Sequence, residues 1–391
     1  MLHRELLVVF ATCLTLAAAR GSPHADDIAE LLKRFGPRCS NSVLEDANLD
    51  VPGLIRKYRY PVEVHCVTTD DGYILEMHRI PHGRDANNDP NQRRTVVFVM
   101  HGLISSSADF VIMGPGRALA YILAEEGFDV WMGNARGNYY SRRHVLLDPE
   151  AHINNAFWKF SWDEIGHKDL PVMIDYVLDV TGEQRLHYVG HSQGTTAFFV
   201  LGSMLPAYND KIISMHALAP VAYMAHNENL LFKILAPYSN KIETMMPAIF
   251  GHVPAGASVR QFAHYGQGIS GKQFRRYDHG TVLENIIKYG SFIPPRYDLF
   301  KITAPVFLHY SDADPLAHVK DVEILFRELG RPIGKFWVPL SGFSHIDFVY
   351  GINAKELVYN RVVSCMKAMD DNAVDFDGDY RVDDLTVNYG L

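Results

Sequence analysis

The chain has 391 residues, 48% hydrophobic and 12% aromatic, which is enough apolar material to bury the core of one large domain or of two average ones. Its formal net charge of −8 comes mainly from residues 370–391, which hold seven Asp and one Arg. The remaining body is close to neutral. This composition excludes an intrinsically disordered chain and gives no electrostatic support to nucleic-acid binding.

The N-terminus has the pattern of a secretory signal peptide. Arg4 precedes an apolar run from Leu6 to Ala19, and the small residues that end the run suit cleavage after position 19. A run of 14 residues is too short to cross a bilayer core of about 30 Å comfortably. A buried N-terminal helix and a membrane anchor are the alternatives. No other stretch approaches a span, so we expect an exported protein without a stable membrane span.

The cysteine count indicates a protein that does not depend on disulfides. Once the leader with Cys13 is removed, Cys39, Cys66 and Cys365 remain, and an odd number cannot all pair. One bridge, for example from Cys39 to Cys66, can form. The chain contains no N-x-[ST] sequence, so N-glycosylation is not expected.

Strand patterns dominate the first part of the body. Val62–Ile80 alternates apolar and polar residues on both sides of a turn at 70–72, which predicts a hairpin at the edge of a sheet. Thr95–Met100 is continuously apolar, as in a buried parallel strand.

Helices and strands then alternate. Ala118–Glu126 has helical spacing, Phe128–Met132 predicts a short strand, and residues 133–143 read as a loop. Ser161 with Glu164 forms a capping-box pattern at the start of a helical stretch that ends near Gly182. This alternation predicts a mostly parallel sheet with helices on both faces.

The sequence LHYVGHSQGTT at Leu186–Thr196 has the form of a nucleophile elbow. A strand runs into Ser192, and helix-compatible residues follow directly. So tight a turn holds its serine in a strained backbone conformation and leaves no room for side chains two positions before and after it. Gly190 and Gly194 occupy those two positions. A five-residue motif is weak evidence alone, and its position between strand and helix gives it weight.

After an apolar run at Ile213–Ala219 the alternation stops. Residues 223–301 contain helical segments and many Gly and Pro without a convincing strand, so we expect an inserted helical cap. Its apolar clusters either contact lipid or pack the cap onto the sheet. Strands resume at Pro305–Tyr310 and Lys335–Leu340, and Ala354–Met369 predicts a final helix.

A serine nucleophile needs a base, and the base needs an acid to orient it, in the chain order Ser, acid, His. Asp314 lies in the loop at the carboxyl end of a predicted strand, where the ligand sites of open α/β sheets form, and is favoured over Asp312. His345 follows the last predicted strand and is the expected base. His318 is too close in sequence to the acid to be its partner.

The reaction also needs donors for the negative charge that develops on the attacked carbonyl. Gln193, directly after the nucleophile, is expected to supply one backbone N–H. The second is expected from Leu103 in the HGL turn after the strand Thr95–Met100, where Gly102 permits a close approach.

Seven segments of the chain resemble those of the acid lipase family of α/β-hydrolases, which includes gastric and lysosomal acid lipases. The resemblance covers roughly residues 55–369 with the blocks in the same order. The segments are YPVEVHCVTTDDGYILEMHRIPHG, HGL, FDVWMGNARGNYYSRRH, FWKFSWDEIGHKDLPVMIDYV, GHSQGTT, YDHGTVLENIIKYG and SHIDF.

This resemblance implies an α/β-hydrolase fold with a helical cap and lid. It implies Ser192 as nucleophile, Asp314 as acid and His345 as base, with Leu103 and Gln193 as oxyanion donors. Neutral lipid esters, either triacylglycerols or sterol esters, would be the substrates. The predicted cap lacks the cysteines that gastric and lysosomal members are expected to carry there. Because glycosylation sites are also missing, secretion is expected rather than a lysosomal location.

We therefore expect a secreted serine ester hydrolase that needs no metal or organic cofactor and acts at a lipid droplet or micelle surface. A carboxylesterase for short soluble esters and a non-catalytic lipid carrier are the alternatives. The expected organisation is a signal peptide at 1–19, a hydrolase core at 20–222 and 302–369, a cap at 223–301 and a disordered acidic tail at 370–391.

Overall fold

The computed structural model describes residues 45–151, 155–227, 249 and 251–371. The predicted signal peptide, the acidic tail beyond residue 371 and most of residues 228–250 lie outside this range. A nine-stranded sheet forms the centre, with the strand order β1-β2-β4-β3-β6-β7-β8-β9 and with β5 paired to β2. Strands from β4 to β9 along this order are parallel, so the predicted α/β-hydrolase architecture with a mostly parallel sheet is confirmed.

The sheet begins with the predicted hairpin. β1 (Glu63–Thr68) pairs antiparallel with β2 (Tyr73–Ile80), and β2 pairs antiparallel with β4 (Asp129–Gly133). The side chains of β1 alternate in burial because this strand lies at the edge. In contrast, β3 (Val96–Met100), β4 and β6 (Leu186–His191) are buried throughout, as expected for central strands covered on both faces.

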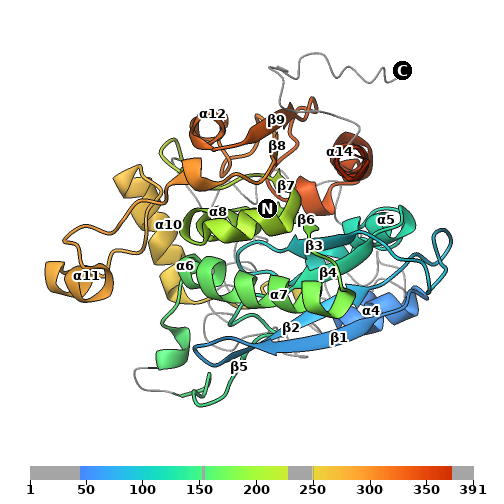
Figure 1. The fold of residues 1–391 in the computed structure, drawn as a ribbon, viewed down its shortest axis with the longest axis horizontal. Coiled ribbons are helices and arrows are strands. Elements are labelled where there is room, and N and C mark those ends of the chain that lie inside the picture. The colour runs from blue at the N-terminus through green and yellow to red at the C-terminus, as the bar shows by residue number, and fades with distance from the viewer. Residues whose placement is uncertain (1–44, 152–154, 228–248, 250, 372–391) are drawn as a thin grey trace, which may run out of the picture.

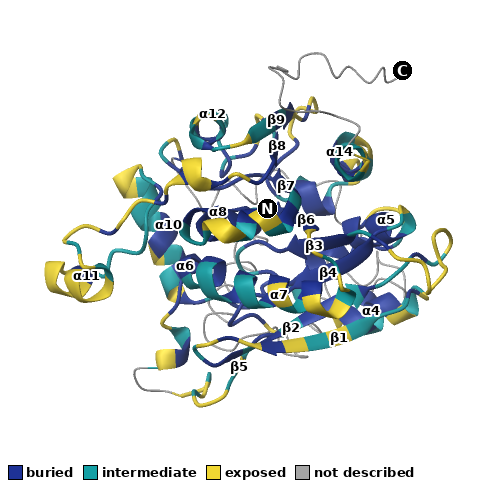
Figure 2. Ribbon diagram, viewed as in Figure 1, coloured by how far each residue is buried: buried dark blue, intermediate teal, exposed yellow. Residues whose placement is uncertain are grey.

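Helices cover both faces of the sheet. Figure 1 shows α7 (Leu170–Thr181) and α8 (Gln193–Met204) on one face, and α5 (Leu119–Glu125) and α14 (Asn360–Asp370) on the other. The dark central strands in Figure 2 show how completely the two layers bury them. The short α4 (Val51–Lys57) precedes the sheet.

The second half supplies the last three strands and the helices between them. β7 (Ile212–Leu218), β8 (Val306–Tyr310) and β9 (Pro332–Trp337) continue the sheet, with α12 (Val319–Glu328) between the last two. Between β7 and β8, the described residues form α10 (Val259–Gly271), α11 (Val282–Tyr289) and one isolated bridge between Arg275 and Arg296.

Several predicted boundaries were wrong. β9 begins at Pro332 and ends at Trp337, three residues before the predicted Lys335–Leu340, because its pairing with β8 sets the register. The loop predicted at 133–143 runs into a two-residue strand, β5 (Arg143–His144), which pairs with β2.

Cys66 and Cys365 carry free thiols, so the suggested bridge at Cys66 is not formed.

Two predicted helices contain a π-helical turn. The capping box of Ser161 and Glu164 is present at the start of α6 (Trp162–Glu164), and a π turn at Ile165–Asp169 then leads into α7. A Cβ atom at Gly166 would lie only 2.5 Å from the Cβ of Val200 on α8, so the two helices meet here at backbone distance. The final helix likewise begins with a π turn at Lys355–Tyr359.

The first π turn carries Asp169 to a buried ion pair. Its carboxylate accepts hydrogen bonds from the Nε (2.7 Å) and backbone N–H (3.0 Å) of Arg136. The same guanidinium donates to Asp71 in the hairpin turn at 2.8 Å and lies 4.0 Å from the ring centre of Tyr73. Arg136 and Asp169 are almost fully buried, so one cation joins the hairpin, the loop after β4 and the π turn.

We expect Arg136→Ala to lower the free energy of unfolding by about 3–5 kcal/mol, because it leaves the buried Asp169 without its counter-ion. Urea denaturation at pH 7 measures the change. Arg93→Ala is the matched control: Arg93 pairs with Glu183 at the surface, and losing an exposed pair should change stability little. An Arg136→Ala protein as stable as the control would contradict this account.

Candidate active site

Ser192 lies between the end of β6 and the start of α8. Its backbone has φ 51° and ψ −116°, a conformation that costs energy in a residue with a side chain. Two hydrogen bonds hold it there: the Ser192 N–H donates to the carbonyl of Leu218 (3.0 Å), and the Thr195 hydroxyl donates to the carbonyl of Ser192 (2.6 Å).

The two flanking glycines allow the turn to close. A Cβ atom at Gly190 would lie 2.7 Å from the carbonyl carbon of Gly194. A Cβ atom at Gly194 would lie 2.2 Å from the carbonyl oxygen of Met100 on β3. Real Cβ atoms do not come so near backbone atoms, so β6, α8 and β3 can pack this closely only with glycine at both positions.

Ser192, His345 and Asp314 meet at the carboxyl ends of the parallel strands. The Ser192 Oγ lies 2.7 Å from the Nε2 of His345. The Nδ1 of His345 lies 3.0 Å and 2.9 Å from the two carboxylate oxygens of Asp314. Since a carboxylate only accepts hydrogen bonds, Nδ1 carries the proton and Nε2 is free to accept one from the serine.

Asp312 and His318, the acid and histidine that the sequence analysis disfavoured, do not join this hydrogen-bonded group. Asp312 is exposed, whereas Asp314 is buried in the loop after β8. His318 is the N-cap residue before α12, and its side chain accepts a hydrogen bond from the backbone of Lys320.

Asp314 is held in its charged form. Burial alone would raise the pKa of this carboxyl, but the charge and hydrogen bond of His345 and the backbone N–H groups of Ala317 (2.9 Å) and Leu316 (2.8 Å) lower it below its usual value. The carboxylate is therefore available to orient the imidazole and to stabilise a positive charge on it.

The HGL turn lies beside the serine. A Cβ atom at Gly102 would lie 3.3 Å from the Cβ of Ser192, so only a glycine fits without displacing its neighbours. His101 Nδ1–H donates to the carbonyl of Gly102 at 2.7 Å, and His101 Nε2 accepts hydrogen bonds from the backbone of Ala135 and the side chain of Asn138, both at 3.1 Å. Burial lowers the pKa of His101 to about 4, which keeps the ring neutral and able to make this pattern.

α10 contacts Gln193, the residue after Ser192. The Gln261 amide donates to the side-chain oxygen of Gln193 at 3.1 Å, and Gln261 also caps α10 by accepting from the backbone of Ser258. Further along both helices, the hydroxyls of Tyr265 and Thr196 lie 3.1 Å apart. These contacts join the segment between β7 and β8 to the start of α8.

Three residues that contact this site were not predicted from the sequence. His191 directly precedes Ser192, and its Nε2–H donates to the backbone carbonyl of His345 at 2.9 Å. Its pKa is lowered to about 3, chiefly by burial and then by the neighbouring His345. The HGL motif predicted only a turn at His101, and no contact of Gln261 was predicted. The capping box of α10 was the available signal for Gln261.

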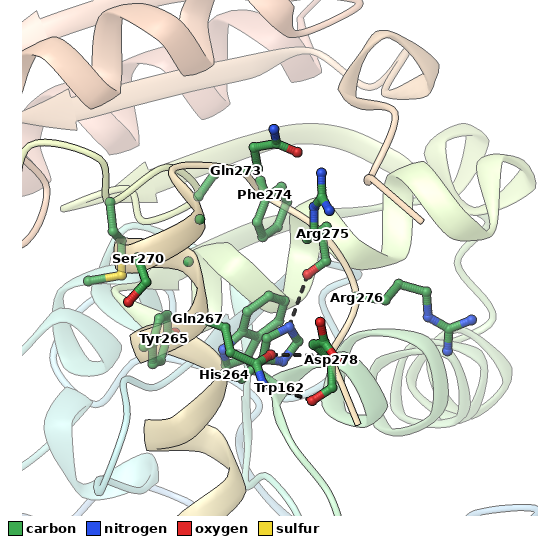
Figure 3. Close-up of a pocket in the computed structure, with 14 residues that line it drawn as sticks. Trp162, His264, Tyr265, Gln267, Ser270, Gln273, Phe274, Arg275, Arg276 and Asp278 are labelled. Carbon is green, nitrogen blue, oxygen red and sulfur yellow. Dashed lines mark hydrogen bonds between the residues drawn. The ribbon is translucent and has the colours of Figure 1, made fainter. Parts of the chain in front are cut away.

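A cavity of about 270 Å³ lies between α10 and residues 272–278 (Figure 3). Ser192, Asp314 and His345 are not among the residues that line it. His264 lies in its wall, stacked on Trp162 with ring centres 3.5 Å apart, and bonded through Nδ1 to Ser161 (3.0 Å) and through Nε2 to the carbonyl of Arg275 (2.9 Å). Asp278 and Arg276 also line the cavity.

No helix among the described residues is long and apolar enough to span a membrane. No cluster of three or more His, Cys, Asp or Glu in the same residues is placed to hold a metal ion.

The sheet order and the strained serine turn define an α/β-hydrolase, and comparisons with known proteins agree. Residues 51–114 match the family model described as a partial alpha/beta-hydrolase lipase region, and residues 95–253 match the alpha/beta hydrolase fold. A crystal structure of a protein from Acinetobacter baumannii shares the fold with a TM-score of 0.50, at 13% identity over 83% of this chain and 99% of that chain.

The sequence relatives are lipases. The chain is 42% identical to Lipase 1 of Drosophila melanogaster over 83% of this chain and 81% of that protein. It is 32% identical to gastric triacylglycerol lipase of Rattus norvegicus, over 82% and 92% of the two chains. The chain belongs to the lipase family of α/β-hydrolases, so it is a carboxylic ester hydrolase.

Buried histidines should make the fold less stable in acid. Burial lowers the pKa of five of them, His101 and His264 to about 4, His191 and His309 to about 3, and His216 well below its usual value. The unfolded chain binds these protons below about pH 6.5, whereas the folded chain does not, so the stability present above pH 6.5 is lost as the pH falls.

Two buried carboxyls act in the opposite direction. Burial raises the pKa of Asp109 and Asp169 to about 6, so their contribution is present in acid and is lost as the pH rises through 6. Because each pKa unit is worth about 1.4 kcal/mol, five histidines outweigh two carboxyls. We expect a lower urea midpoint at pH 4.5 than at pH 7.5. An equal or higher midpoint in acid would show that the histidines do not dominate.

Proposed function

We propose that this enzyme is a secreted serine lipase that hydrolyses neutral lipid esters, either triacylglycerols or sterol esters, through an acyl-enzyme intermediate. The 2.7 Å separation of Ser192 Oγ and His345 Nε2 carries the proposal, since it places a hydroxyl next to a group that can take its proton. The gastric triacylglycerol lipase relatives support the substrate class. The signal-peptide pattern at residues 1–19 supports secretion.

In the first step the Ser192 Oγ attacks the ester carbonyl while His345 Nε2 takes the hydroxyl proton. The tetrahedral intermediate then collapses, the bond to the alcohol breaks, and His345 returns the proton to the departing oxygen. Water, deprotonated by the same imidazole, attacks the acyl-enzyme and releases the carboxylic acid and free Ser192. Asp314 stabilises the positive charge on His345 during each transfer.

The backbone N–H groups of Leu103 and Gln193 are the proposed oxyanion donors. The positions of the two residues support this assignment, because Gly102 lies against Ser192 and Gln193 begins α8. An N–H at the start of a helix has no partner within that helix, and the helix dipole creates a positive potential at that end. The neutral His101 holds the carbonyl of Gly102 and hence the orientation of the peptide that follows.

We also propose that residues 20–222 and 302–369 form the hydrolase core and residues 223–301 form a cap. The contacts of α10 with Gln193 and Thr196 support a cap that covers this end of α8. We propose no role for the acidic tail at 370–391. The proposed reaction uses only protein groups and water.

Ser192→Ala should lower kcat by about 10⁶-fold, because no other group can form the acyl-enzyme. It should also abolish labelling by a fluorophosphonate probe. Circular dichroism and the urea midpoint test whether the variant is folded. Ser364→Ala, which alters an exposed serine on α14, is the matched control and should keep full activity. A folded Ser192→Ala enzyme that retains the wild-type rate, or a wild type that the probe does not label, would refute the proposal.

Substrate preference separates a lipase from a carboxylesterase. We expect a faster rate on emulsified triolein than on dissolved short-chain esters at equal ester concentration, measured by titration of released acid between pH 4 and 9. Cholesteryl oleate in the same emulsion compares sterol with glycerol esters. A rate that saturates in true solution and does not rise when an emulsion forms would favour a carboxylesterase.

A further inference from the structure

One helix of the described chain turns its apolar side toward solvent. Figure 1 shows α11 standing out from the body beyond α10, and Figure 2 shows that most of it is exposed. Val282, Leu283 and Ile287 are 58%, 66% and 77% exposed, and Ile286 is 37% exposed. Exposed apolar residues that occur singly need no explanation, but four on one short helix do.

The three sides of α11 differ in character. At 100° per residue, the four apolar side chains occupy one continuous arc of roughly 140°. The charged Glu284 and Lys288 lie on the next sector, and Asn285 and Tyr289 lie on the third, which faces the protein. The helix is therefore amphipathic with its apolar side outward.

Polar contacts fix this orientation. Asn285 is buried, and its amide donates to Asp278 (3.1 Å) and to the carbonyl of Phe292 (3.3 Å), while its oxygen accepts from the backbone of His279 (3.1 Å). The Tyr289 hydroxyl donates to the carbonyl of Tyr277 at 2.8 Å. A surface helix that only covered a core would instead pack its apolar side inward.

The apolar surface continues past the helix. Gly290 ends α11 in the left-handed conformation, and Phe292 and Ile293 follow with exposed fractions of 67% and 60%. We call the six side chains the α11 patch; its members are Val282, Leu283, Ile286, Ile287, Phe292 and Ile293.

We propose that the α11 patch binds the surface of an emulsified lipid and holds the enzyme there, an inference that rests on the proposed lipase function. A helix with separate apolar and charged sides lies in the plane of a lipid interface with its apolar side inserted. The helix that carries the patch stands out from the body (Figure 1), so a broad lipid surface can reach it. The six members of the patch include no Trp, Tyr or Arg, the residues that most often anchor protein partners.

The patch is connected to the serine through α10. Asp278, which accepts from Asn285 of α11, also exchanges two backbone hydrogen bonds of 2.8 Å with the side chain of Gln267 on α10. Gln261, nearer the start of the same helix, contacts Gln193 beside the nucleophile. Binding through α11 would therefore bring this side of the enzyme to the lipid.

Leu283→Ser with Ile287→Ser tests the assignment without changing charge. Both side chains are mostly exposed, so folding should be retained. Val180→Ser with Ile352→Ser is the matched control, because these exposed apolar residues lie on α7 and before α14, away from the patch. Partition onto triolein droplets coated with phosphatidylcholine is measured by flotation, with Ser192→Ala present in every protein so that binding is scored without hydrolysis.

We expect the α11 variant to partition about tenfold or more weakly, since two large apolar side chains no longer leave water. The control should partition like the parent, and with Ser192 intact the α11 variant should hydrolyse a dissolved short ester at the wild-type rate. Equal partition of the α11 variant and the parent would overturn the proposal. So would a parent dimer, seen by sedimentation, that the variant dissociates while droplet binding persists. A wild type that binds droplets through α11 but hydrolyses no ester would refute only the proposed function.

Discussion

The strained backbone of Ser192 is the constraint on which the site depends. A positive φ at a serine is unfavourable, so neighbouring groups must hold it, and the structure does so with the carbonyl of Leu218 on β7 and the hydroxyl of Thr195 on α8. The required closeness of β3, β6 and α8 excludes side chains at Gly190 and Gly194. The placement of the Ser192 hydroxyl is thus a product of the packing of three elements.

The same end of the sheet also holds His345 in place. His345 is restrained at its ring by Asp314 and at its backbone carbonyl by His191, the residue directly before Ser192. Because burial keeps His191 neutral, its Nε2–H remains a donor without adding a positive charge beside the imidazole of His345. The positions of Ser192 and His345 are therefore coupled through one buried histidine.

Much of this arrangement was predictable because it follows from short-range rules. The hairpin, the elbow glycines, the capping box and the order of Ser192, Asp314 and His345 are all local patterns or consequences of a parallel sheet. The contacts of His101 with Asn138 and of Gln193 with Gln261 join residues 37 and 68 positions apart, which no local pattern specifies. The π turn at 165–169 depends on how close α8 comes to Gly166.

α11 shows a further limit of sequence patterns. Apolar residues at helical spacing identify one side of a helix, and burial inside the protein is the usual reason for that side. Here Asn285 reverses the orientation, because its amide satisfies Asp278, the backbone of His279 and the carbonyl of Phe292 at once. Turning the apolar side inward would expose Asn285 and leave those groups to find other partners. The polar contacts of one residue therefore decide that the apolar side faces outward, toward whatever the enzyme meets in solution.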